Sequence, residues 1–95
     1  MITTKLYTIY DSKAAMYAFP FKSRTNGEAI RAFTNIANDK QHPIGQHPED
    51  YILFHCGTYD DTSGEIKMAP KESLGSAIEF ISKDEPLPPI DRDWE

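Results

Sequence analysis

The sequence has little of several features that would place the protein in a specialised class. Its 95 residues contain one cysteine, Cys56, which cannot form an internal disulfide and which, within an apolar run, is expected to behave as a small hydrophobic residue. No apolar run approaches the roughly 20 residues that a membrane-spanning helix needs, and the N-terminus lacks the basic and apolar regions of a signal peptide. We therefore expect a soluble protein of a reducing, cytosolic compartment, without a membrane partner.

The chain also lacks an excess of positive charge. Its net charge of −5 at pH 7 argues against a uniformly basic nucleic-acid-binding surface. The charge is distributed unevenly, however, because residues 1–47 carry a net +3 and residues 48–95 a net −8. This asymmetry is more informative than the total, because it gathers the basic residues in the first half of the chain.

The composition is that of a folded domain. Hydrophobic residues make up 39% of the chain and charged residues 26%, with five Phe, five Tyr and one Trp, which is typical of a globular protein and not of a disordered one. A chain of this length can bury enough apolar surface to fold alone, with little margin. We expect one α+β domain over residues 1–82.

The first half of the chain predicts a hairpin followed by a helix. Residues 4–10 alternate in β-branched and aromatic side chains, and residues 15–21 resume an aromatic run after a turn, with Pro20 requiring an edge or an end of that strand. Thr25 and Glu28 have the spacing of a capping box. The helix that starts there carries one apolar stripe and ends at Asn38-Asp39; the stripe consists of Ala29, Ile30, Phe33, Ile36 and Ala37.

The second half predicts a second hairpin and a short helix. Residues 40–50 contain Pro43, Gly45 and Pro48 and read as a loop. Residues 51–59 form a continuous bulky run that predicts a central strand, and residues 60–64 form a turn leading to a shorter partner strand at 65–69. Helical spacing resumes from Ser73 to Ile81. The expected order is ββαββα, an antiparallel sheet of about four strands with two helices packed on it.

The histidines and Cys56 invite a metal or nucleophile hypothesis that their spacing does not support. His42 and His47 each precede a proline in the predicted loop, and His55 and Cys56 point to opposite faces of a strand, so these residues fit no closed tetrahedral set. Cys56 lies in a run that suggests a core face, which disfavours a Cys-His nucleophile pair. No catalytic motif or phosphate-binding glycine loop stands out. We expect no enzyme, no metal and no cofactor.

The predicted first hairpin interleaves basic and aromatic residues. Bases stack on exposed aromatic rings while cations contact phosphates, which is how many proteins bind single-stranded nucleic acid. The alternative for each ring is that it belongs to the core, as half or more must in so small a domain. Arg31 faces away from the apolar stripe and either binds phosphate or solvates the helix. The candidate nucleic-acid-binding residues are Lys5, Tyr7, Tyr10, Lys13, Tyr17, Phe19, Lys22, Arg24 and Arg31.

Residues 83–95 form a proline-rich, acidic C-terminal tail. Pro86, Pro88 and Pro89 favour an extended path, and three of the last five residues are acidic. Trp94, flanked by carboxylates, suits anchoring in a basic pocket of a partner, or the tail competes with nucleic acid for the basic hairpin. A solubilising end is the alternative.

Several irregular strings resemble a viral family. YTIYDSKA at 7–14, AIRAF at 29–33, ANDKQHPIGQHPEDYILFHCG at 37–57 and YDDTSGE at 59–65 are similar to the small nonstructural protein of gokushoviruses, single-stranded-DNA bacteriophages of the microvirus family. The resemblance covers about residues 5–80. It implies a protein of the infected bacterial cytoplasm, associated with viral DNA synthesis and DNA binding, and it brings no catalytic residues.

Two functions follow as expectations. The first is a nonenzymatic phage protein that binds single-stranded DNA during genome replication. We expect this protein to form a homodimer. The second is an interaction module that recruits a host or viral replication or assembly protein through the acidic tail and the His-Pro loop.

Overall fold

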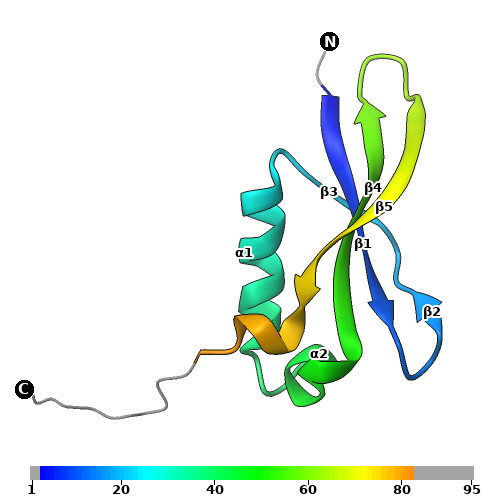
Figure 1. The fold of residues 1–95 in the computed structure, drawn as a ribbon. Helices are drawn as coiled ribbons and strands as arrows, with labels where there is room; N and C mark the ends of the chain where they lie inside the picture. Colours follow the sequence, from blue (N-terminus) through cyan, green and yellow to red (C-terminus); the bar gives the residue numbers. More distant parts are fainter. Residues whose placement is uncertain (1–2, 83–95) are drawn as a thin grey trace, which may run out of the picture.

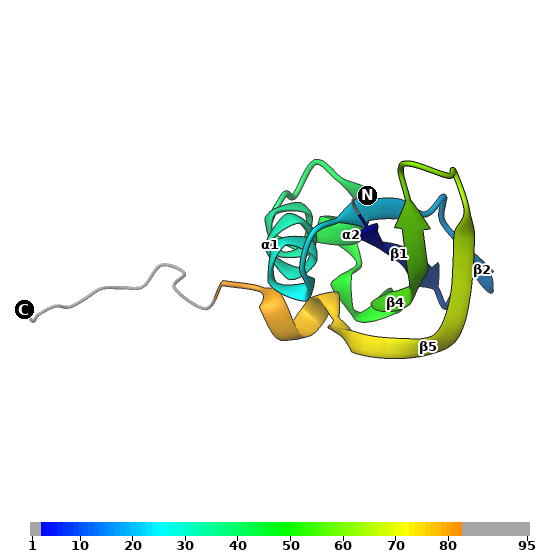
Figure 2. The same ribbon diagram turned by 90° about the horizontal axis from the view of Figure 1, so that it is seen from above.

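The protein is an α+β structure in which an antiparallel sheet packs against one main helix, as the sequence predicts. The computed structural model describes residues 3–82, and the predicted tail at 83–95 lies outside them. The strands run the length of the molecule beside α1, with the short helices at one end (Figure 1, Figure 2). In chain order the elements are β1 (Thr3–Asp11), β2 (Met16–Tyr17), β3 (Phe21–Ser23), α1 (Asn26–Ala37), α2 (Pro43–Gln46), η1 (Pro48–Asp50), β4 (Tyr51–Asp60), β5 (Ile66–Ser76) and η2 (Ala77–Phe80).

The sheet has β4 at its centre, which confirms the sequence prediction. The strand order is β2-β1-β4-β5, and β3 also pairs with β1. β4 pairs antiparallel with β1 on one side, where Thr8 lies opposite Phe54, and with β5 on the other, where Phe54 lies opposite Ser73. Over residues 3–82, no helix is long and apolar enough to cross a membrane.

The strand predicted at 15–21 is divided into β2 and β3 on either side of Pro20. β2 pairs with β1 through Tyr17 and Tyr10, and β3 pairs with β1 through Lys22 and Leu6. Pro20 has no N–H to donate to a ladder and lies in the break between them. Its predicted position at an edge or strand end is confirmed, and the division explains why the sheet has five strands where about four were expected.

The main helix α1 begins at the predicted cap. The Thr25 Oγ1 accepts a hydrogen bond from the Glu28 amide at 3.1 Å, which satisfies one of the free donors of the first turn. The Glu28 carboxylate accepts from the Arg24 amide and guanidinium, one residue earlier than a capping box requires. The apolar stripe turns inward as predicted, because Ala29, Phe33 and Ala37 are buried.

The core lies between α1 and one face of the sheet. Tyr7, Ile9 and Leu53 supply the sheet side and are almost fully buried. The Tyr7 hydroxyl donates to the Asn26 side-chain oxygen at 2.7 Å, which gives this buried polar atom a partner. Burial also raises the pKa of Tyr7. The ring stacks on Phe21 of β3, with centroids 5.7 Å apart.

The segment at 40–50 contains two short helices where the sequence predicted an irregular loop. Pro43 opens α2, because the first helical position needs no N–H and proline supplies the required φ. His42 caps this turn, and its Nδ1 accepts from the Ile44 amide at 3.1 Å. The interpretation of His42-Pro43 as loop architecture is therefore refined, since the dipeptide begins a helical turn.

The last two elements differ from the prediction. β5 continues to Ser76 and is not shorter than β4, and the helix expected from Ser73 is reduced to the 3₁₀ turn η2. Gly75 has a φ of +131°, which no helix contains. The helix begins instead after Ser76, whose amide donates to the Glu79 carboxylate at 3.1 Å in a capping box.

We expect Ala15→Gly to raise the free energy of unfolding by about 0.5 to 1 kcal/mol. Ala15 has a φ of +57° in the turn between β1 and β2, a region that glycine adopts without a Cβ clash. Urea denaturation measures the change. The neighbouring Ala14→Gly is the control and should lower stability, since Ala14 does not have a positive φ. A lower midpoint for Ala15→Gly would contradict the prediction.

Candidate nucleic-acid interface

The side of the sheet that faces away from α1 carries a group of aromatic and basic residues. Successive strand residues point to opposite faces, so Tyr10 of β1 lies on the face opposite the buried Tyr7 and Ile9. Tyr17 of β2 lies opposite Tyr10, and Phe54 of β4 lies opposite Thr8 on the same face. We call this surface the open face and define it by Tyr10, Tyr17, Lys22, Phe54 and Lys71.

Three rings of the open face form a contiguous cluster. The Tyr10 and Tyr17 centroids are 4.7 Å apart with planes tilted by 46°, and the Tyr17 and Phe54 rings meet edge to face at 6.2 Å. Tyr17 remains 47% exposed. The Lys71 ammonium lies 5.2 Å from the Tyr17 ring centroid, within the range of a cation–π interaction. The open face therefore offers a half-exposed ring beside a positive charge.

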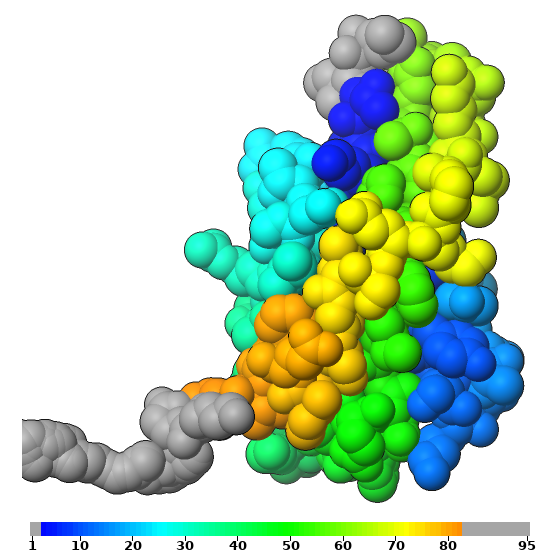
Figure 3. Space-filling model, viewed as in Figure 1, coloured from blue at the N-terminus to red at the C-terminus, as the bar shows by residue number. Residues whose placement is uncertain are grey.

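Some of the predicted site residues come together here, and two members of the open face were missed. Tyr10, Tyr17 and Lys22 lie on it. Phe54 was assigned to a buried run, and its contact with Tyr17 follows from the pairing of β4 with β1. Lys71 lies in a segment that the sequence placed between a strand and a helix, and the extension of β5 brings it to Tyr17 (Figure 3 shows β5 crossing the molecule in yellow).

Tyr7 is a correction to the predicted site. It is fully buried against α1, so its ring cannot stack on a base, and it belongs to the core alternative. The reason is the strand period, which places Tyr7 and Tyr10 on opposite faces. Lys5 shares the face of Tyr7 and is likewise separated from the open face.

The remaining predicted residues are exposed but lie apart from the aromatic cluster. Lys13 is in the turn after β1, and Arg31 is exposed on α1. The Arg24 guanidinium donates to the Glu28 carboxylate at 3.0 Å in an exposed ion pair. This ion pair occupies part of the hydrogen-bonding edge of the guanidinium. Phe19 is 95% exposed and borders a different feature, an apolar groove.

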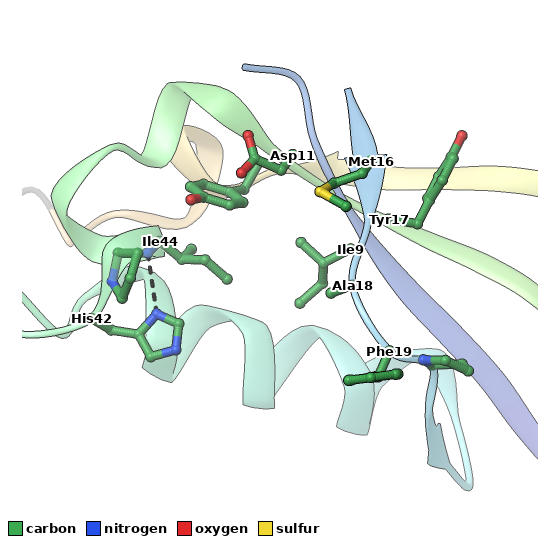
Figure 4. A pocket seen from close by; sticks show the side chains of 11 residues that line it. Ile9, Asp11, Met16, Tyr17, Ala18, Phe19, His42 and Ile44 are labelled. Carbon is green, nitrogen blue, oxygen red and sulfur yellow. Dashed lines mark hydrogen bonds between the residues drawn. The ribbon is translucent and has the colours of Figure 1, made fainter. Parts of the chain in front are cut away.

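The apolar groove lies between the segment that follows β1 and the helix α2. Its cavity volume is about 640 Å³, and Figure 4 shows its walls, with Tyr17 directed away from it. The dashed line in Figure 4 is the bond that caps α2 at His42. The side chains that matter most for its chemistry are Met16, Phe19, Pro20, Pro43, Ile44 and Tyr51.

The histidines and the cysteine are distributed over separate places. Around η1, one potential ligand atom from each of His47, Glu49 and Asp50 lies within 4.8 Å of the other two. His42 instead caps α2, and His55 of β4 contacts the ring of Tyr7 of β1. Cys56 is buried, its thiol donates to the Leu6 carbonyl at 3.6 Å, and burial raises its pKa despite the nearby Lys71. A buried thiol with a raised pKa is a poor nucleophile, which agrees with its predicted role as a small hydrophobic residue.

The fold and the open face define a small α+β sheet protein with a helix on one face and an aromatic, partly basic surface on the other. Within this class, the family described as Phage ORF5 protein matches residues 4–80, and the chain belongs to that family. It is therefore a phage protein, as the resemblance implied. No curated protein and no solved structure matches the chain.

Proposed function

We propose that the protein binds single-stranded DNA on its open face during phage genome replication, without catalysing a reaction. The observation that carries the proposal is the cluster of Tyr10, Tyr17 and Phe54 with Lys71 held over the Tyr17 ring. Every base has a π-face that stacks on such a ring, and an adjacent ammonium contacts the phosphate backbone. The resemblance to gokushovirus nonstructural proteins supports the same function, and we propose that the protein acts in the cytoplasm of the infected bacterial host.

The charge of the open face sets a limit on the electrostatic part of binding. Lys22 and Lys71 lie on it, and Lys13 is exposed in the adjoining turn. Two or three phosphate contacts correspond to a slope of about −1.4 to −2.1 in log affinity against log salt for a single strand. This shallow dependence is compatible with the acidic total charge, because stacking then supplies a larger share of the affinity than phosphate contacts do.

A homodimer extends this surface. β5 is the last strand of the sheet, with its outer edge unpaired among residues 3–82, and it exposes Ile66 and Met68. Pairing of two such edges would cover these apolar side chains and join two sheets. The two open faces would then offer a longer path to one DNA strand.

The decisive experiment measures fluorescence anisotropy of a labelled single-stranded oligonucleotide across salt concentrations. Tyr17→Ala should weaken binding about 5- to 150-fold, because loss of one stacking ring costs about 1 to 3 kcal/mol. Tyr17→Phe retains the ring and should bind as the unmodified protein does. Lys71→Ala should reduce the salt slope by about 0.7, and Lys40→Ala, an exposed lysine away from the open face, should not. Absence of binding at low salt, or equal affinity of Tyr17→Ala, would refute the proposal.

The apolar groove favours a second candidate function, recruitment of a host or viral replication or assembly protein. An exposed aromatic at the rim of a concave apolar surface is typical of protein-binding sites. Phe19→Asp, at the rim of the groove, separates the two functions in a pull-down from infected cells. Loss of a captured partner with unchanged DNA affinity would favour recruitment over DNA binding.

A further inference from the structure

The apolar groove is separated from the open face by the edge strand β2. Tyr17 belongs to both surfaces, because its ring lies in the cluster of the open face while the residue also lines the groove. Figure 4 shows Met16 and Phe19 on the strand side and Ile44 on the helix side of the groove. β2 has only two residues and is the last strand on its side of the sheet among residues 3–82. A ligand on the open face therefore meets the groove as soon as it crosses this edge.

We propose, on the basis of the function proposed above, that the groove binds one unstacked base of the DNA strand that lies on the open face. Single strands are recognised by splaying their bases apart and stacking them on aromatic rings. The Phe19 ring is 95% exposed and offers such a ring at the rim. The cavity of about 640 Å³ lies within the range of about 300 to 1,000 Å³ that is usual for small ligands. Lys13 is exposed in the turn between β1 and β2, so a cation adjoins the crossing.

The polar groups of the groove favour a base over a purely apolar ligand. The Asp11 carboxylate accepts from two backbone amides of the following turn, and Tyr51 forms a side-chain hydrogen bond with it. A carboxylate accepts about four hydrogen bonds, so one acceptor position remains. The His42 Nδ1 accepts from the Ile44 amide, which leaves Nε2 of this groove residue as a donor. The groove thus combines an acceptor from β1 with a donor from the cap of α2, and the edge of a base carries partners for both.

The Asp11 carboxylate gives this site a preference among bases. Its remaining acceptor position pairs with an exocyclic amino group, which cytosine carries and thymine lacks. Thymine presents carbonyl oxygens in its place, and a carboxylate repels them. The two pyrimidines have the same ring size, so comparing them isolates the amino group. We expect a strand of dC to bind about 2- to 12-fold more tightly than a strand of dT, which corresponds to one hydrogen bond.

The test measures fluorescence anisotropy of labelled dC and dT oligonucleotides with the full chain. Phe19→Ala should weaken binding of the dC strand about 5- to 150-fold, as loss of one stacked base does, and Phe19→Tyr should retain it. Asp11→Asn keeps an oxygen for the amides of the turn and should remove the preference for dC. Ile78→Ala is the matched control and should change neither, because Ile78 is an exposed hydrophobic residue of η2 that does not line the groove.

The outcomes separate the groove from the open face. Unchanged binding by Phe19→Ala together with weaker binding by Tyr17→Ala would overturn the assignment of the groove and leave the proposed function intact. Equal affinity of the unmodified protein for dC and dT would also overturn it. Absence of any binding at low salt would refute the proposed function itself. A Phe19→Asp protein that loses a captured partner but binds DNA normally would assign the groove to a protein instead of a base.

Discussion

Phe33→Ala is expected to lower the free energy of unfolding by about 3 to 5 kcal/mol. Phe33 is 1% exposed on the inner face of α1, and its ring meets Phe80 of η2 edge to face at 6.0 Å. The truncation would leave a cavity between the helix, the sheet and the last turn of the domain. Because small domains have only about 5 to 15 kcal/mol of stability, this loss should lower the urea midpoint by at least about a fifth of its original value.

Phe19→Ala is the matched control for Phe33→Ala. It removes the same atoms from a side chain that is 95% exposed, and should change stability by less than about 0.5 kcal/mol. Equal effects of the two substitutions would contradict the assignment of Phe33 to the core.

Gly45→Ala is expected to destabilise the protein by about 1 to 3 kcal/mol or more. A Cβ at this buried position would lie 1.9 Å from the Asp39 carbonyl oxygen and 3.1 Å from that of Ile36. Both neighbours are backbone atoms that anchor the end of α1, so α2 would have to move outward. Since Ile44 of α2 lines the groove, the same change should weaken any contact made there.

Gly27→Ala provides the comparison for Gly45→Ala. Gly27 lies in the first turn of α1, where a Cβ would approach nothing closer than the Thr25 Oγ1 at 3.8 Å. We expect it to stabilise the protein by up to about 1 kcal/mol, because alanine has the higher helix propensity. Urea denaturation of both variants measures the difference. A stable Gly45→Ala protein would show that α2 does not approach Asp39 as closely as described.

The predictable parts of the fold are those governed by local chemistry. Thr25 caps α1 because its hydroxyl satisfies an amide three residues away, and the stripe of Ala29 and Phe33 turns inward because the helix period aligns these positions. Pro20 interrupts an edge strand because it lacks an N–H. Each of these statements needs only residues that are close together in the sequence.

The elements that differ from prediction depend on distant contacts. The apolar spacing from Leu74 to Ile81 suits a helix, but it also suits a strand followed by a turn that packs on α1. The positive φ of Gly75 excludes the continuous helix and is compatible with the strand and turn. β5 therefore extends to Ser76, where it pairs with Ile52 of β4. The one-turn helix at Pro43 is likewise held by packing of Ile44 in the core and by the approach of Gly45 to Asp39.

The candidate site was only partly accessible to the sequence. The basic and aromatic composition of the first hairpin indicated Tyr10, Tyr17 and Lys22, which share the open face. This composition could not show that Tyr17 is exposed and Tyr7 is buried. The pairing register decides which face each residue of an edge strand divided at Pro20 occupies. Phe54 and Lys71 join the open face only through β4 and β5.

The sequence by itself determined the α+β class, the helix α1 with its cap and buried stripe, the central position of β4 and membership of a phage protein family over residues 4–80. These depend on local periodicity, capping chemistry and motifs that the chain carries in one dimension. Only the tertiary structure decided that Tyr7 is buried, that Lys71 meets Tyr17 and that Phe19 borders a groove with α2. The physical reason is that strand register and chain crossing select which distant side chains meet, and neither is encoded by spacing along one strand.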